Sequence, residues 1–155
     1  MKALYSVAAA FLICASSAFA AVEQLDDFSI DLPDGWTLKK ARGLPGFMSI
    51  YDPSEEHAIN IRIERDREER VADVLKEGFD MKIEVHDGVA VARHDWGIAI
   101  ATKGADGAYL EIDVNTPLLQ KAPQLIRSMK ADPSSPELKP AFEKLASDSA
   151  LQLLK

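Results

Sequence analysis

Short runs of alternating apolar residues, separated by glycine and proline turns, constrain the fold of this chain most strongly. The segment Ala58–Ile63 reads A-I-N-I-R-I, which places its three isoleucines on one face of an extended strand. Comparable runs occupy 28–32, 36–38, 47–51, 81–85, 89–93, 97–102 and 108–114. Turn residues such as Pro33-Asp34-Gly35 and Asp87-Gly88 lie between them. This spacing predicts an antiparallel sheet.

Two segments have helical rather than alternating periodicity. Apolar residues recur at helical spacing over 67–79, after a highly charged start, and again over 117–130. Pro123 lies inside the second segment and is expected to kink or restart that helix. The runs V-A-V-A and I-A-I-A are small or apolar on both faces, so their alanines should let a helix approach the sheet closely. The chain is therefore expected to be an α+β domain, with a central antiparallel β-sheet flanked by helices.

The C-terminal part is set off by composition. Residues 132–139 contain Asp132-Pro133-Ser134-Ser135-Pro136 and are expected to be a linker between a domain at 21–131 and an amphipathic helix at 140–155. The apolar stripe of this helix consists of Phe142, Leu145, Ala146, Ala150, Leu153 and Leu154. Such a stripe either folds back onto the domain, which we expect, or is presented to a partner.

The first twenty residues predict export from the cytoplasm of a bacterium. Lys2 precedes an apolar run, and Ala18-Phe19-Ala20 supplies the small residues that signal peptidase requires, so 1–20 is expected to be a signal peptide cleaved after Ala20. The apolar run is short for a bilayer span, so no integral membrane anchor is expected. Cys14 is the only cysteine, and Ile13 before it does not fit a lipoprotein signal. The mature protein is expected to be periplasmic or secreted, without disulfides.

The charge of the chain excludes one class of partner. Its formal net charge is −7, and no segment combines basic and aromatic residues. An acidic surface repels the phosphate backbone, so nucleic acid is not expected to bind.

No recognised catalytic or cofactor motif occurs in the sequence. His86-Asp87 and His94-Asp95 contain possible metal ligands, but they should lie at opposite ends of one strand, roughly 15 Å apart. A catalytic triad that used Ser29, Ser49 or Ser54 lacks the G-x-S-x-G turn. The acidic residues that precede Trp36 lack the spacing of a calcium loop, and are expected to be solvated. We therefore predict no catalytic residue, no metal and no cofactor.

Four apolar residues are the candidates for contact with a ligand or partner: Trp96, Phe142, Leu145 and Leu153. Aromatic side chains and exposed helical stripes are common at binding surfaces. The sequence does not identify the molecule that they would bind.

The segment Phe28–Trp36, F-S-I-D-L-P-D-G-W, resembles the opening hairpin of the PsbP-like α/β/α sandwich group. The predicted order of strands, helix, meander and helix is similar to that group over about 27–130. The resemblance implies an antiparallel sheet between helices, and an accessory or binding role without catalysis. No functional residue is carried over from this hairpin, because its proline, glycine and tryptophan serve geometry and packing.

These features together predict an exported, non-catalytic binding or accessory module of the cell envelope, whose partner is an envelope protein or a small ligand. The alternative is a small periplasmic hydrolase with an acidic or serine site. An enzyme should show polar side chains that converge in an enclosed cleft, whereas an interaction protein should show an exposed apolar groove.

Overall fold

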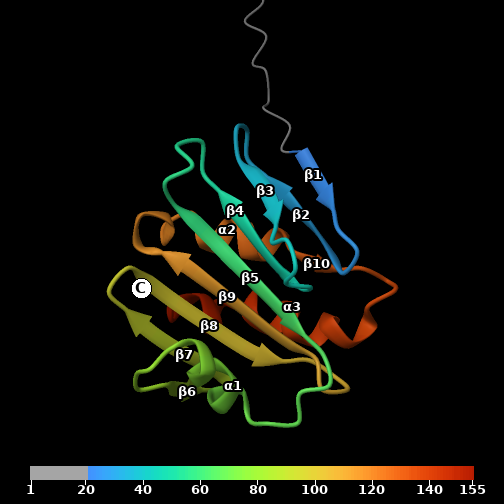
Figure 1. Ribbon diagram of the computed structural model, residues 1–155, viewed down its shortest axis with the longest axis vertical. Helices are drawn as coiled ribbons and strands as arrows, with labels where there is room; N and C mark the ends of the chain where they lie inside the picture. The colour runs from blue at the N-terminus through green and yellow to red at the C-terminus, as the bar shows by residue number, and fades with distance from the viewer. Residues whose placement is uncertain (1–20) are drawn as a thin grey trace, which may run out of the picture.

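The computed structural model describes residues 21–155, which contain a large and a small antiparallel sheet (Figure 1). The large sheet has seven strands, in the order β3 (Thr37–Lys40), β4 (Phe47–Tyr51), β5 (Ala58–Glu64), β9 (Tyr109–Asn115), β8 (Gly97–Lys103), β7 (Val89–His94) and β6 (Glu84–His86). The alternating segments form the strands predicted from them, although β6 begins later than expected. The predicted α+β class with a central antiparallel sheet is confirmed.

The small sheet corrects the predicted N-terminal hairpin. β2 (Phe28–Leu32) pairs with β1 (Ala21–Gln24) on one side and with β10 (Lys130–Ala131) on the other. The turn before Trp36 does form, with Gly35 at a φ of 78°, but it leads the chain into β3 of the large sheet. β2 and β3 are therefore not hairpin partners, because both edges of β2 are already occupied.

Four helices and two short 3₁₀ turns complete the described part of the chain. Helix α1 (Val71–Gly78) is shorter than the predicted 67–79. In place of one helix over 117–130, a 3₁₀ turn at Thr116–Leu118 precedes α2 (Ala122–Ser128). Pro123 lies in the first turn of α2, where its missing N–H costs no helical hydrogen bond, so the helix restarts there.

The C-terminal segment differs from the predicted linker and single helix. Ser135 and Leu138 in the expected linker are buried, and the helical region is divided into α3 (Lys139–Leu145) and α4 (Asp148–Gln152). Ser147 breaks the helix because its backbone is extended and its Oγ accepts a hydrogen bond from Ala150 N, at 3.3 Å, as an N-cap. Arg93 of β7 donates to the carbonyl of Leu153, at 2.9 Å. The segment therefore packs onto its own domain.

The two faces of the large sheet carry different cores. On one face, isoleucine, leucine and valine side chains pack against α2, α3, α4 and β2, and the rings of Phe28 and Phe142 are 5.2 Å apart. On the other face, Val74 and Leu75 of α1 lie on alanines of β7 and β8. Figure 1 shows α2 and α3 behind the strands, and α1 on the near side beside β7. The C-terminal helices thus form one layer, and α1 forms a second, partial layer.

The prediction of a signal peptide at 1–20 falls outside the described residues. Between residues 21 and 155, no helix combines the length and the apolar character that a bilayer crossing requires.

Candidate functional site

The structure does not bring the four sequence candidates together. The Trp96 side chain lies on the β7–β8 turn and is 63% exposed. Leu145 is fully buried in the main core, and Phe142 is 3% exposed. Leu153 is half-buried at the end of α4. These positions remain candidates of different kinds: one exposed ring, one partly accessible leucine, and two core residues.

The serines considered for a triad are not hydrogen-bonded to histidine anywhere in residues 21–155. Ser49 Oγ donates to Asn60 Oδ1 at 2.7 Å, and Ser54 Oγ donates to Asp52 Oδ1 at 2.7 Å. A serine nucleophile needs a base within hydrogen-bonding reach of its hydroxyl. In a serine–histidine–aspartate triad that base is a histidine, and among residues 21–155 neither hydroxyl contacts one.

Two of the acidic residues before Trp36, Asp26 and Asp27, form ion pairs with basic side chains. Asp27 Oδ1 lies 2.5 Å from Arg65 Nη2 and also accepts from Ser135 Oγ, at 3.1 Å. Asp26 pairs with Lys40 at 3.2 Å. These contacts join the N-terminal segment to the large sheet and to the segment after β10, which is a structural role.

His94 occupies a buried position that the sequence reading did not single out as a paired residue. Its Nε2 lies 2.8 Å from Asp113 Oδ1 on β9, and its side chain is 1% exposed. The ring stacks on Phe79 with centroids 5.0 Å apart, and Trp96 packs edge-on at 4.9 Å. The intervening strand β8 presents Gly97 and Ala99 opposite these residues, and such small side chains leave room for the imidazole to cross β8.

The hydrogen bond between His94 and Asp113 indicates which nitrogen of the imidazole carries a proton. A carboxylate accepts hydrogen bonds only, so Nε2 carries the proton and donates to Asp113. Nδ1 is buried and makes no hydrogen bond with any residue of 21–155. His86 lies before β7 and His94 at its far end, so β7 separates the two histidines. The pair orients the β7–β8 turn and the loop that carries Phe79.

A second buried polar group lies beneath α1. Tyr109 donates from its hydroxyl to Glu111 Oε2 at 2.8 Å, and Arg62 Nη1 lies 3.5 Å from the same oxygen. Burial raises the pKa of the Glu111 carboxyl, although the Tyr109 hydrogen bond and the Arg62 charge oppose this rise. Burial, together with the neighbouring Glu111 charge, also raises the pKa of the Tyr109 hydroxyl. Arg62 further pairs with Glu64 at 2.5 Å, so the group is a compact charge network.

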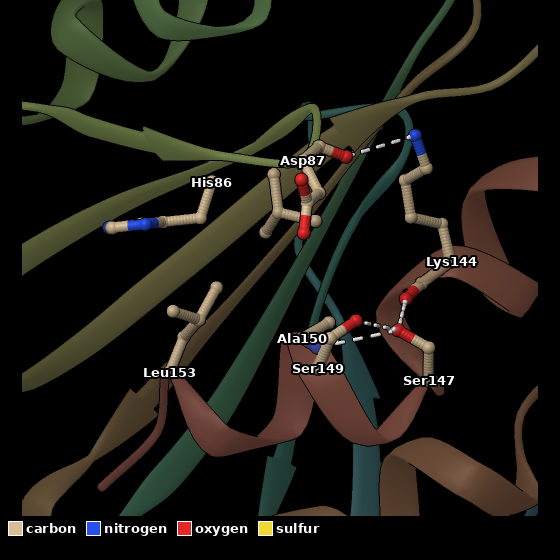
Figure 2. Close-up of a pocket in the computed structure, with 8 residues that line it drawn as sticks. His86, Asp87, Lys144, Ser147, Ser149, Ala150 and Leu153 are labelled. Carbon is tan, nitrogen blue, oxygen red and sulfur yellow. Dashed lines mark hydrogen bonds between the residues drawn. The ribbon is translucent and has the colours of Figure 1, made fainter.

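A small pocket of about 210 Å³ lies between the β6–β7 turn and α4 (Figure 2). Lys144 Nζ donates to the backbone oxygen of Asp87 at 3.2 Å, and Ser147 Oγ donates to the carbonyl of Lys144 at 2.6 Å. Ser149 Oγ lies 3.1 Å from Ser147 Oγ. Figure 2 shows the His86 ring directed away from both serines. The hydroxyl of Ser147 thus caps a helix, and no base is placed to activate it.

Two open grooves, floored by apolar side chains, lie on the outer side of the C-terminal helices. The first, which we call the Phe142 groove, has a volume of about 390 Å³ and lies between the end of α2 and α3. Its apolar side chains are Met129, Ala131, Phe142 and Ala146, and its charged side chains are Arg127, Lys130, Lys139 and Glu143.

The second, the Leu119 groove, has a volume of about 470 Å³ and lies between the start of α2 and the end of α4. Its apolar side chains are Leu119, Pro123, Leu151 and Leu154. Both volumes lie within the range of ligand sites. Neither groove carries a sequence motif, because each is made by residues that are far apart in the chain.

One ion pair joins α2 to α4 beside the Phe142 groove. Arg127 Nη2 of α2 lies 2.7 Å from Asp148 Oδ1 of α4, and the Asp148 side chain is 89% exposed. α2 contributes Arg127 to the Phe142 groove and Pro123 to the Leu119 groove, and we call the two grooves together the helix seam. An exposed ion pair of this kind contributes little to stability, about 0–1 kcal/mol.

No protein family and no curated protein matches this chain. Among solved structures, the chain is similar to cyanobacterial PsbP (CyanoP) from Synechocystis sp. PCC 6803, determined in solution, with 13% sequence identity and a TM-score of 0.45. The match covers 77% of this chain and 97% of that one. It agrees with the weak PsbP-like resemblance found in the Phe28–Trp36 segment, and no functional residue is carried over from it.

Proposed function

We propose that this protein is a non-catalytic binding or accessory module, exported to the bacterial cell envelope, and that it binds its partner at the helix seam. The observation that carries this proposal is the pair of open grooves floored by apolar side chains of α2, α3 and α4. Grooves lined mostly by apolar side chains are common sites for a ligand or partner.

The polar side chains of the small pocket support the same proposal. Its lysine and serines hydrogen-bond within the protein, so they hold the β6–β7 turn against α4. A hydrolase needs a nucleophile, a base and a site for the reacting atom within mutual reach. The geometry of the small pocket favours binding over the hydrolase alternative.

Export is proposed from the sequence of residues 1–20. Cleavage after Ala20 would leave β1 whole, because the pairing of β1 with β2 begins at Ala21 opposite Leu32. Edman sequencing of the protein recovered from the envelope fraction is expected to start at Ala21. A start at an acylated Cys14, or an uncleaved chain, would contradict this part of the proposal.

Site-specific photocrosslinking in living cells tests the binding surface. A photoreactive amino acid at Gln120 samples the Leu119 groove, and the same residue at Lys130 samples the Phe142 groove. Lys82, whose side chain is 86% exposed beside β6, is the matched control position. We expect the two seam positions to crosslink one shared partner, identified by mass spectrometry, and Lys82 to crosslink none. Crosslinks from Lys82 alone, or from no position, would overturn the proposed function.

A further inference from the structure

The small pocket between the β6–β7 turn and α4 is lined by two opposite charges that do not pair with each other (Figure 2). Lys144 Nζ donates to the backbone oxygen of Asp87 at 3.2 Å, but it forms no ion pair with a carboxylate of residues 21–155. The Asp87 carboxylate likewise forms no ion pair or hydrogen bond with that part of the chain. Both residues are exposed. Their two charges are therefore available to a ligand.

The conformation of the β6–β7 turn brings both residues to the pocket. Asp87 has a φ of 49°, which aspartate tolerates better than most residues, and Gly88 follows it at 79°. A Cβ atom at Gly88 would lie 3.0 Å from Lys144 Nζ, so the missing side chain lets the ammonium group lie against the turn. The contact with Asp87 uses one of the three N–H donors of Lys144, and the other two remain for a ligand.

The rest of the pocket supplies aliphatic groups and a hydroxyl group. Val89, Ala150 and Leu153 line it, and the first two are buried. Figure 2 shows the Leu153 side chain directed from the end of α4 toward the β6–β7 turn. The Ser149 hydroxyl group contacts only Ser147 Oγ within residues 21–155, at 3.1 Å. The pocket thus combines a short aliphatic surface with the two unpaired charges.

The volume and the charges together restrict the class of ligand. The pocket volume of about 210 Å³ lies below the range of roughly 300–1,000 Å³ that holds drug-sized molecules. A simple anion would pair with Lys144 but would be repelled by Asp87, and a simple cation would meet the opposite arrangement. A small zwitterion gives each side chain a counter-charge.

We propose that the small pocket binds a free α-amino acid with a short aliphatic side chain. The ligand carboxylate pairs with the Lys144 ammonium group, and the ligand ammonium group pairs with the Asp87 carboxylate. The aliphatic side chain of the ligand lies on Val89, Ala150 and Leu153. This inference goes beyond the proposed function, because the eight residues that line the pocket differ from those that line the helix seam.

Two-dimensional NMR of the intact protein with L-valine tests the inference. The amide signals of Gly88 and Ser149 report on the pocket. The matched ligands are isovalerate, which is valine without its amino group, and isobutylamine, which is valine without its carboxylate. We expect valine to shift these signals in a saturable way, and each matched ligand to bind about tenfold more weakly. Equal affinity for valine and isovalerate, or no saturable shift with valine, would overturn the inference.

Variants that remove one charge assign each end of the ligand. Asp87→Asn should weaken the binding of valine about tenfold without weakening that of isovalerate, because isovalerate has no ammonium group. Lys144→Gln should weaken the binding of valine by a similar factor without weakening that of isobutylamine, which has no carboxylate. A general disturbance of the turn would instead weaken all three ligands. Such a common loss in both variants would overturn the inference.

Two controls make the same chemical changes outside the pocket. Asp106→Asn alters an exposed aspartate with a φ of 50° that also precedes a glycine in a turn. Lys76→Gln removes an exposed lysine of α1. Both should bind valine as the native protein does, and a tenfold loss in either would show that net charge, rather than the pocket, sets the affinity.

A dipeptide tests whether the ligand is a free amino acid. The two charges of valyl-valine lie farther apart than those of valine, and the molecule is larger. We expect it to bind more weakly than valine in the same NMR titration. A higher affinity for valyl-valine would overturn the assignment to a free amino acid.

Discussion

The two faces of the large sheet are covered in different ways, and the size of their side chains explains the difference. The face toward α2, α3 and α4 carries isoleucines such as Ile61 and Ile112, which fill the space beneath a complete layer. The opposite face carries alanines under α1, and charged residues such as Arg62 beyond it. Large apolar side chains need several helices above them to exclude water. A row of alanines lets one helix approach the sheet closely, and the adjoining strands on that face carry polar side chains.

Removal of the C-terminal helices should expose the core on the first face and unfold the domain. Truncation after Ala131 deletes Leu138, Phe142 and Leu145, all buried, and each such side chain contributes about 2–5 kcal/mol. Their combined loss, about 6–15 kcal/mol, is as large as the stability of a typical domain, about 5–15 kcal/mol. We expect the truncated chain to lose its cooperative transition in urea, followed by circular dichroism. A normal transition would show that these helices do not hold the domain together.

A larger side chain in the row of alanines should disturb the packing of α1 on the second face. The loss of stability should be smaller than that caused by the truncation. Ala99→Leu places a larger side chain beneath Val74 and Leu75 of α1 and should cost about 1–3 kcal/mol. Ala105→Leu, at an exposed turn position, is the matched control and should change stability by less than about 0.5 kcal/mol. Urea midpoints measure both variants. Equal midpoints would mean that α1 does not lie close to β8.

The stability that the polar residues of the second face contribute should depend on pH. The pKa of Glu111 is raised by burial, so the folded state holds this proton more tightly than the unfolded chain. Its contribution to stability is present below the unfolded pKa and is lost as the pH rises through the folded pKa. Glutamine at this position stays neutral, so the stability of Glu111→Gln relative to the native protein should rise as the pH increases from acidic to neutral.

Urea unfolding of both proteins at several pH values measures this difference. Glu56→Gln is the control, because Glu56 is exposed and makes no ion pair with any residue of 21–155. A Glu111→Gln difference that falls with rising pH would show that ion pairing with Arg62 outweighs burial.

The smallest effect is expected at the edge of the second face. Trp96 is largely exposed and contacts the His94 ring only edge-on, so Trp96→Ala should cost less than about 1 kcal/mol. Differential scanning calorimetry checks this. A much larger loss would show that the indole, rather than Phe79 and Asp113, keeps His94 in place.

Alternation in the sequence was sufficient to predict most strands of the large sheet, because period-two patterning places side chains on known faces. It failed for the small sheet. β1 and β10 have four and two residues, too few for a recognisable period, and only their pairing shows that β2 belongs to a second sheet. The split between α3 and α4 was missed because Ser147 lies within a continuous apolar stripe and its capping role depends on backbone conformation.

The candidate site was less predictable than the fold. The helix seam depends on how α2 lies beside α4, and the pairing of Arg127 with Asp148 joins residues that no local motif connects. The contact between His94 and Asp113 crosses a whole strand. The small residues Gly97 and Ala99 on that strand were the one available signal, because they mark where a longer side chain can pass over it.

The unequal ends of the large sheet bear on how the protein behaves at high concentration. One edge, β3, presents Lys39 and Lys40, and the other, β6, has three exposed residues, of which Val85 is 52% exposed. An unpaired strand edge is where copies of a protein add to one another and begin to aggregate, and short length and charged side chains both oppose this. Both edge strands are short and carry charged side chains, but β6 also exposes the apolar Val85, so a charged residue in place of Val85 should reduce aggregation of concentrated protein.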